Sequence, residues 1–229
     1  MIQALIFDFD GLILDTEAPI YRSWVELYRS YGLELSFDAW MTSVGTGLQD
    51  SPFDPHVDLE ARLGRKIPWE DVGPRRQERE LQLVREQHIL PGVLAYIEEA
   101  RRQDLKLGVA SSSDHQWVDT HLKRLELYDH FDTIQCSDDV VLTKPDPALY
   151  LSAARALSVE PAHSLALEDS PLGVQAAKRA GMYCVAVPNE ITGRMTFGEV
   201  DLMLKSLEEL SLEQLLARIE RTDGRSRPR

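Results

Sequence analysis

Two pairs of acidic residues follow short apolar runs of the chain. Asp8 and Asp10 come directly after residues 2–7, and Glu168 and Asp169 come directly after residues 164–167. Side chains two positions apart in an extended segment point to the same side, so Asp8 and Asp10 can face one spot. Two carboxylates placed that close favour a cation between them or a proton on one of them. Taken alone, a turn or a helix N-cap explains either pair equally well.

A run of hydroxyl side chains follows a third apolar segment. Ser111, Ser112 and Ser113 come directly after residues 105–110 and precede Asp114 and a helical pattern. Hydroxyls and free backbone N–H groups at the start of a helix form a natural cradle for phosphate. Ordinary capping of that helix is the alternative, and for this run by itself it is the better explanation.

A lysine lies in a proline-rich segment further along the chain. Lys144 is followed by Pro145-Asp146-Pro147. Proline fixes the backbone and disfavours helix at the preceding residue, so the lysine is held on a stiff loop. There it could neutralise a phosphate or screen an acidic cluster, and a solvated surface lysine is the alternative.

The elements that must position these residues can be read from hydrophobic spacing. Apolar runs at residues 2–7, 105–110, 164–167 and 183–187 alternate with amphipathic helical patterns. This alternation predicts an α/β fold with a doubly wound, Rossmann-like parallel sheet. Ligands of such sheets bind outside the carboxyl ends of the strands. The acids, the serines and the lysine would meet at that edge.

The segment between the first two strand-like runs is organised differently. It has helical patterns and turn-rich stretches but no strand-like run. A parallel crossover needs far fewer residues, so we expect an inserted α-helical cap domain at residues 15–88, over the C-terminal edge of the sheet. The catalytic core would then be discontinuous, at residues 1–14 and 89–229. From about residue 220 the chain lacks an apolar face and is rich in Arg, which predicts a disordered tail; a phosphate-binding tail is the alternative.

Composition and charge argue against several classes of function. The formal net charge of -13 at pH 7 repels polyphosphate backbones, so we expect no nucleic-acid partner. No apolar run approaches the roughly 18 residues that span a membrane, and the N-terminal segment lacks a signal-peptide pattern. We therefore expect a cytoplasmic monomer with no membrane partner. Cys136 and Cys184 lie in contexts typical of buried structural thiols.

Taken in order, these segments resemble the four motifs of the haloacid dehalogenase superfamily. The segment DFDGLILDT at residues 8–16 is similar to the first motif, and VASSS at residues 109–113 is similar to the second. The segment TKPDP around Lys144 is similar to the third motif, and EDS at residues 168–170 is similar to the fourth. The resemblance extends to about residue 190 and includes the position of the helical insertion. The closest pattern is that of the β-phosphoglucomutase-like subfamily with a helical cap, which includes sugar-phosphate phosphatases as well as the mutase.

The resemblance implies roles for the residues of the first three motifs. Asp8 would be the nucleophile that takes the phosphoryl group as an aspartyl phosphate. Asp10 would be the general acid and base, and its presence favours phosphate over carbon–halogen chemistry. Ser111, with Ser112 beside it, and Lys144 would hold the phosphoryl oxygens. The substrate would be a small phosphorylated metabolite.

The resemblance also implies a magnesium ion as cofactor. Mg²⁺ would be bound by Asp8, by the backbone carbonyl of Asp10 and by Asp169. Glu168 would be an outer or water-mediated partner of the ion.

Two departures from the mutase favour a phosphatase. The mutase has a His shortly after its first motif, where this chain has Ile20, and an Arg in its cap loop, where residues 44–50 contain no basic residue. Three hypotheses stay open: a magnesium-dependent phosphatase of a sugar phosphate or related metabolite, a sugar phosphomutase, and a catalytically silent binding module. The motifs do not identify the natural substrate.

Candidate substrate contacts in the cap come from a cluster of arginines. Arg75 and Arg76 follow Pro74, a residue type that favours the first helical position, and a helix would place Arg79 on the same face as Arg75. Arg75 and Arg76 could bind an anionic substrate, because guanidinium groups suit bidentate recognition of phosphate or carboxylate. An exposed face that pairs with Glu78 and Glu80 is the alternative.

Overall fold

The chain forms two compact units in the computed structural model, which describes residues 1–42 and 53–225. One unit combines Met1–Leu14 with Ile89–Arg229, and the other is Asp15–His88. The first unit contains the sheet, and the second is helical in its described residues.

The two points at which the chain leaves and re-enters the first unit lie side by side. Leu14 and Ile89 form an antiparallel β-bridge. The Leu90 N–H donates a hydrogen bond to the Ile13 carbonyl at 2.9 Å. Both ends of the inserted segment are therefore fixed to one place on the first unit.

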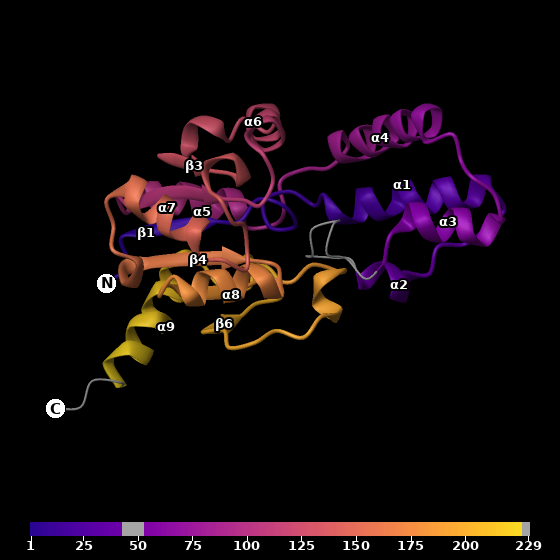
Figure 1. Cartoon of the computed structure of the whole chain (residues 1–229). Coiled ribbons are helices and arrows are strands. Elements are labelled where there is room, and N and C mark those ends of the chain that lie inside the picture. The colour runs from indigo at the N-terminus through magenta and orange to yellow at the C-terminus, as the bar shows by residue number, and fades with distance from the viewer. Residues whose placement is uncertain (43–52, 226–229) are drawn as a thin grey trace. The chain divides into compact units, whose positions relative to one another are not determined.

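The described residues of the first unit form a six-stranded sheet in the order β3-β2-β1-β4-β5-β6, with every pairing parallel (Figure 1). This is the doubly wound α/β sheet that the sequence predicts. Two strands, β3 and β6, were not predicted, because they are very short and only partly buried. The strands are β1 Ala4–Phe7, β2 Lys106–Ala110, β3 Thr133–Gln135, β4 Ser164–Glu168, β5 Tyr183–Ala186 and β6 Leu202–Met203.

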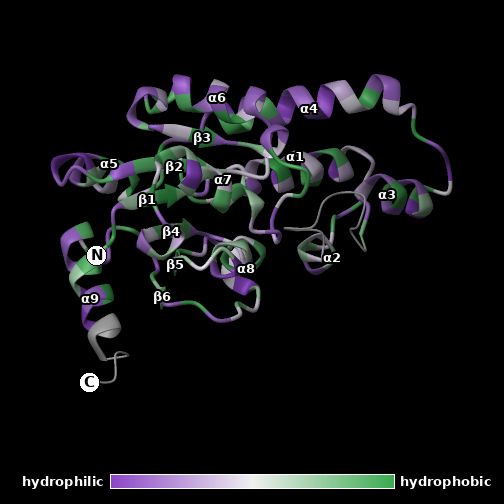
Figure 2. Ribbon diagram, turned by 60° about the vertical axis from the view of Figure 1, so that its left-hand side comes forward, coloured by the Kyte–Doolittle hydropathy of each residue, from purple (hydrophilic) through white to green (hydrophobic). Residues whose placement is uncertain are grey.

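The central strands are buried on both faces, as a parallel sheet covered by helices requires. Ile6 belongs to a buried cluster with Leu149 and Val174 from two flanking helices. Its neighbours Leu5 and Phe7 are equally buried and point to the opposite face, because side chains alternate along a strand. In Figure 2 the central strands are mainly hydrophobic, whereas the helices mix hydrophobic and hydrophilic positions. The helices of this unit are α5 Val93–Arg102, α6 His115–Arg124, α7 Ala148–Leu157, α8 Pro171–Arg179 and α9 Leu212–Arg225.

The second unit is held together by aromatic side chains between its helices. Trp24 and Tyr28 are buried on the first helix, and the Tyr28 hydroxyl donates to the Pro55 carbonyl at 2.8 Å. Leu59 and Leu83 complete this small core. The described helices are α1 Glu17–Ser30, α2 Phe37–Met41, α3 Pro55–Leu63 and α4 Trp69–Arg85.

Two local expectations about helix ends are wrong. Helix α4 begins at Trp69, so Pro74 lies inside the helix and not at its first position. At the other end of the chain, α9 continues to Arg225, where disorder is expected from about residue 220. The buried side chains of Leu212, Leu215 and Ile219 recur at helical spacing, and a helix once formed extends at low cost. Residues 226–229 lie outside the described part of the chain.

Two further observations concern the helices as possible membrane spans and the cysteine thiols. In residues 1–42 and 53–225, none of the helices has both the length and the apolar character needed to cross a membrane. Cys136 and Cys184 are both free and buried, as expected for structural thiols.

The central strand β4 offers a test of this packing. Leu165 is fully buried on β4, whereas Leu94 on α5 is 42% exposed. Leu165→Ala should lower the free energy of unfolding by about 3 kcal/mol, because the change removes buried methyl groups and leaves a cavity. Leu94→Ala should lower the free energy of unfolding, measured with urea, by well under half as much. Equal losses at the two leucines would contradict this description of the core.

Candidate functional site

The predicted acids meet at the position where the strand order of the sheet reverses. β1 pairs with β2 on one side and with β4 on the other, so connections leave this point in both directions. Asp8 follows β1, and its N–H donates to the Leu167 carbonyl of β4 at 2.9 Å. Asp169 directly follows β4. The carboxyl ends of the strands at such a switch point are where doubly wound sheets bind their ligands.

Three carboxylates gather at this edge of the sheet. Asp8, Glu168 and Asp169 are all buried, and each offers an oxygen within 4.8 Å of the others. Asp169 is held by Asn189, whose Nδ2 donates to Asp169 Oδ2 at 2.8 Å. Gly11 lies close by, because a Cβ built on it would come within 2.2 Å of the same oxygen. Such an oxygen cluster suits a hard divalent cation such as Mg²⁺.

Lys144 is the cationic partner of this cluster. Its Nζ lies 2.5 Å from Asp8 Oδ1 and 2.6 Å from Glu168 Oε1. The Lys144 side chain is only 6% exposed, which excludes a solvated surface lysine. Glu168 also accepts a hydrogen bond from the Tyr150 hydroxyl at 2.5 Å. Glu168 is therefore bonded to two protein donors, Lys144 and Tyr150.

Burial and charge act in opposite directions on the lysine and its partner. Burial raises the pKa of Asp8 most strongly, Lys144 lowers it, and Glu168 and Asp10 raise it again, to about 8 overall. Burial lowers the pKa of Lys144, but the carboxylates of Asp8 and Glu168 outweigh this effect and hold that pKa above its ordinary value. Negative charge is thus in excess among the described residues of the cluster. A bound cation would favour ionised Asp8.

The serine run meets Asp10. Ser113 Oγ donates to Asp10 Oδ2 at 2.7 Å, and Ser111 Oγ lies 3.3 Å from the same oxygen. The indole Nε1–H of Trp117 donates to Asp10 Oδ1 at 2.9 Å. Asp114 caps helix α6 by accepting from the Trp117 backbone N–H at 2.8 Å. Asp114 and not a serine therefore caps α6, whereas Ser111 and Ser113 contact an acid of the site.

Comparison with known proteins identifies this arrangement. Residues 5–187 match the family described as "Haloacid dehalogenase-like hydrolase". The chain belongs to the haloacid dehalogenase-like hydrolase family. The resemblance inferred from the four motifs is thereby confirmed, and the protein is a hydrolase of this family.

Several relatives cover nearly the whole chain of this hydrolase. The Bacillus subtilis (strain 168) protein "Putative phosphatase YhcW" is 46% identical over 216 residues, which are 94% of this chain and 97% of the relative. "Hexitol phosphatase B" of Escherichia coli (strain K12) is 34% identical over 224 residues, with 94% and 97% covered. A Thermotoga maritima crystal structure titled as a "putative beta-phosphoglucomutase" superimposes with a TM-score of 0.77 at 28% identity, covering 94% of this chain and 99% of that one. These matches support the β-phosphoglucomutase-like subfamily.

The arginines predicted to bind substrate lie in the other unit of the hydrolase. Arg76 Nη1 donates to Ser23 Oγ at 3.0 Å and forms an ion pair with Glu80, while its guanidinium lies 4.7 Å from the centroid of the Trp24 ring. Arg76 is therefore held within Asp15–His88, and the pairing with Glu80 that was the alternative is present. Arg75 is exposed. Cap-loop residues 44–50 lie outside the described residues.

Residue-type reasoning missed three side chains of the site. Asn189 follows the strand-like run at residues 183–187, so its position after a strand was a signal in the sequence. Tyr150 and Trp117 lie on helices α7 and α6, and their spacing does not distinguish them from core aromatics. Of the predicted residues, Ser112 is exposed and makes no recorded contact with the acids.

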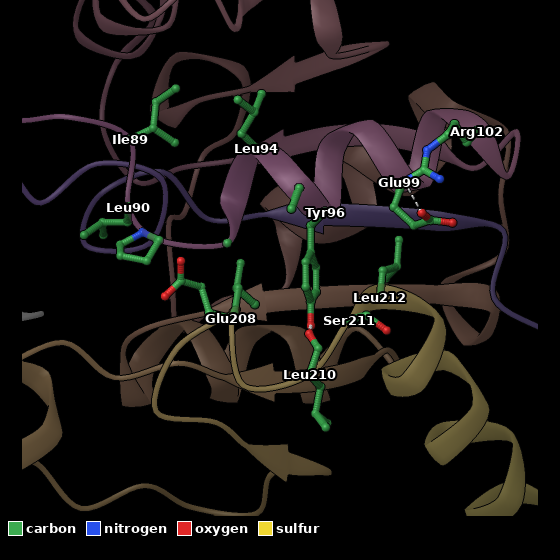
Figure 3. A pocket seen from close by; sticks show the side chains of 14 residues that line it. Ile89, Leu90, Leu94, Tyr96, Glu99, Arg102, Glu208, Leu210, Ser211 and Leu212 are labelled. Atoms are coloured by element: carbon green, nitrogen blue, oxygen red, sulfur yellow. Dashed lines mark hydrogen bonds and ion pairs between the residues drawn. The ribbon is translucent and has the colours of Figure 1, made fainter.

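A separate cavity of about 630 Å³ lies away from these residues. It is bounded by one side of α5, by the segment before this helix and by residues 207–212, and Tyr96 donates across it to the Leu210 carbonyl at 2.9 Å (Figure 3). Its polar lining includes an ion pair between Glu99 and Arg102. Its lining contains none of the motif residues, so the carboxyl ends of β1 and β4 are the better candidate site.

Substitution of Gly11 tests how closely the backbone approaches the Asp169 carboxylate. Gly11 and Gly181 have nearly the same positive φ, +82° and +80°, but a Cβ on Gly181 would meet nothing within 4 Å. Gly181→Ala should cost only the conformational penalty of about 1–2 kcal/mol. Gly11→Ala should lower the free energy of unfolding, measured with urea, clearly more, because the added methyl group collides with the Asp169 carboxylate. Equal costs would contradict the close approach.

His115 connects the start of α6 to the segment after β3. Its Nε2 lies 2.8 Å from Asp139 Oδ2, and its Nδ1 lies 3.3 Å from Asp119 Oδ1. Burial lowers the pKa of His115, but hydrogen bonds and charge from Asp119 and Asp139 outweigh this and raise it above its ordinary value. The protonated imidazole therefore stabilises the folded state.

This pKa shift predicts a specific pH dependence of stability. Because the folded pKa is raised, the stabilisation by His115 is complete below the unfolded pKa of about 6.5 and is lost as pH rises through the folded pKa. His115→Gln should therefore be less stable than the wild type at low pH, and the difference should shrink as pH rises. Urea unfolding of both proteins between about pH 5.5 and 8.5 measures this. A difference that grows with pH would contradict it.

Proposed function

We propose that this hydrolase is a phosphatase of small phosphomonoesters that works through an aspartyl phosphate on Asp8. The observation that carries the proposal is the buried contact between Asp8 and Lys144 at the switch point of the sheet. A buried carboxylate beside an ammonium group is a suitable nucleophile, since it can be ionised and also face an anionic phosphate. The phosphatase names of the relatives agree with this chemistry.

The proposed reaction has two balanced halves. First, a carboxylate oxygen of Asp8 forms a bond to phosphorus while the bond from phosphorus to the ester oxygen breaks, and Asp10 gives its proton to that leaving oxygen. The product of this half is a free alcohol. Then Asp10 takes a proton from water as the water oxygen attacks phosphorus, and the bond from phosphorus to Asp8 breaks. Inorganic phosphate leaves, and both carboxyl groups return to their starting states.

Lys144 and Ser111 would bind the phosphoryl oxygens during both halves. The ammonium group of Lys144 can neutralise charge on the transferring group, because it is fixed at the cluster by Asp8 and Glu168. Ser111 is buried and directly follows β2, with its N–H bonded to the Gln135 carbonyl at 2.9 Å. Its hydroxyl is therefore positioned by the sheet.

The acidic cluster also fits a magnesium ion. Asp8, Asp169 and the backbone carbonyl of Asp10 would hold it, with Glu168 outside this set. When bound, Mg²⁺ supplies positive charge that stabilises the transferring phosphoryl group and orients it.

We further propose that the substrate is a sugar phosphate or a related metabolite. The named hexitol phosphatase is similar over nearly the full length of both chains. The unit Asp15–His88 is the part of the chain without the proposed catalytic residues, and we assign substrate selection to it. Arg75 is its exposed candidate for an anionic group, whereas Arg76 supports the fold of that unit.

The proposal predicts loss of phosphate release when the nucleophile is removed. Asp8→Asn should lower kcat for the best substrate by at least about 10³-fold, because the amide cannot form the covalent intermediate. The measurement is phosphate release from a panel of sugar, nucleotide and small organic phosphates, with and without Mg²⁺. Asp129→Asn, the same change at an exposed aspartate of the same unit, should keep full activity.

The outcomes of the panel separate the hypotheses. Release that requires Mg²⁺ and Asp8 supports the phosphatase. Normal turnover by Asp8→Asn would overturn it. Isomerisation of a hexose phosphate on addition of a bisphosphate primer, without phosphate release, would indicate the mutase. Inactivity in both assays would indicate a binding module.

A further inference from the structure

Asp10 is held by a donor that lies outside the four motifs. The indole Nε1–H of Trp117 donates to Asp10 Oδ1 at 2.9 Å, and Ser113 Oγ contacts the other carboxyl oxygen, Oδ2, at 2.7 Å. The two oxygens of one carboxyl group are thus bound from two different positions. Such a pair of contacts fixes the rotation of the carboxyl plane.

The two donors differ in what they permit. An indole N–H can only donate, whereas a serine hydroxyl can donate or accept. Oδ1 is therefore always an acceptor while the Trp117 contact is present.

Trp117 is itself fixed by aromatic packing. The ring of His121, one turn further along α6, lies 4.4 Å from the Trp117 ring at an interplanar angle of 70°. His121 is buried and stacks on Phe9 at 6.4 Å. Because Phe9 lies between Asp8 and Asp10 in the chain, the indole is held by the same loop whose carboxylate it binds.

We infer that Trp117 is a positioning residue that orients the Asp10 carboxyl group. This inference rests on the proposed function, in which Asp10 protonates the ester oxygen. It adds a residue from helix α6 to the groups that hold the proposed general acid.

The leaving group of the substrate provides a selective test. A sugar alkoxide is a poor leaving group and needs the proton from Asp10, whereas p-nitrophenolate departs without one. Trp117→Phe keeps an aromatic ring but removes the N–H. It should lower kcat/KM for the best sugar phosphate of the panel about tenfold, while kcat/KM for p-nitrophenyl phosphate changes less than about twofold.

Tyr96 provides a control from the same unit. Its hydroxyl donates to the Leu210 carbonyl at 2.9 Å, away from the acids. Tyr96→Phe keeps an aromatic ring, removes one side-chain hydrogen bond and should leave the ratio of the two kcat/KM values unchanged. In an Asp10→Asn background, Trp117→Phe should add no further selective loss, because the two residues act as one unit.

The results distinguish failure of this inference from failure of the proposed function. If Trp117→Phe lowers both kcat/KM values equally, or lowers neither, the contact is only structural and the inference is wrong. If the wild type releases phosphate from neither ester, the proposed function is wrong, and the inference fails with it.

A measurement on the folded wild type does not depend on the stability of Trp117→Phe. In an NMR spectrum of protein with ¹⁵N-labelled tryptophan, each indole Nε1–H gives one signal. The signal of the indole bonded to Asp10 is the one that stays in place in Trp69→Phe and shifts upfield in Asp10→Ala. The inference requires one tryptophan signal to respond in this way. Failure of every indole signal to move in Asp10→Ala would overturn it.

Discussion

The contact between Lys144 and the carboxylates of Asp8 and Glu168 is the interaction on which the rest of the site depends. Burial of an ionised carboxylate without a partner would cost several kcal/mol of folding free energy, and three such carboxylates together would not all remain ionised. The lysine reduces that cost by bonding two of them at 2.5 and 2.6 Å. The stiff, proline-flanked loop that carries Lys144 is therefore as much a part of the site as the strands that carry the acids.

The surroundings of Glu168 show how closely the fold is adapted to this contact. Tyr150 donates to the same Glu168 oxygen as Lys144, and Ser170 Oγ approaches the other oxygen at 3.3 Å. A Cβ on Gly173 would come within 2.0 Å of the carboxylate, so a residue without a side chain is needed at the start of α8. Both oxygens of Glu168 are therefore bonded to protein donors, which hold this carboxylate beside Lys144.

The sequence predicts the fold class and most of the site for a physical reason. Parallel strands bring their carboxyl ends to one edge, so polar residues that follow separate apolar runs, such as Asp8 and Asp169, converge without knowledge of the packing. Side chains that reach the site from the middle of helices carry no such signal, and Trp117 and Tyr150 were missed for that reason. The short strands β3 and β6 depend on pairing with their neighbours in the sheet, which local patterns do not contain.

The two aspartates of the first motif are two residues apart but lie in different environments. Asp8 is buried and bonded to an ammonium group, which suits the carboxylate that attacks phosphorus in the proposed mechanism. Asp10 is partly exposed and bonded by neutral donors, the hydroxyl of Ser113 and the indole of Trp117, which suits the proposed general acid and base. Pairs of acids with contrasting surroundings commonly divide nucleophilic and acid–base roles between them. Under this proposal the motif supplies the two acids, and side chains from separate segments of the fold would decide which task each performs.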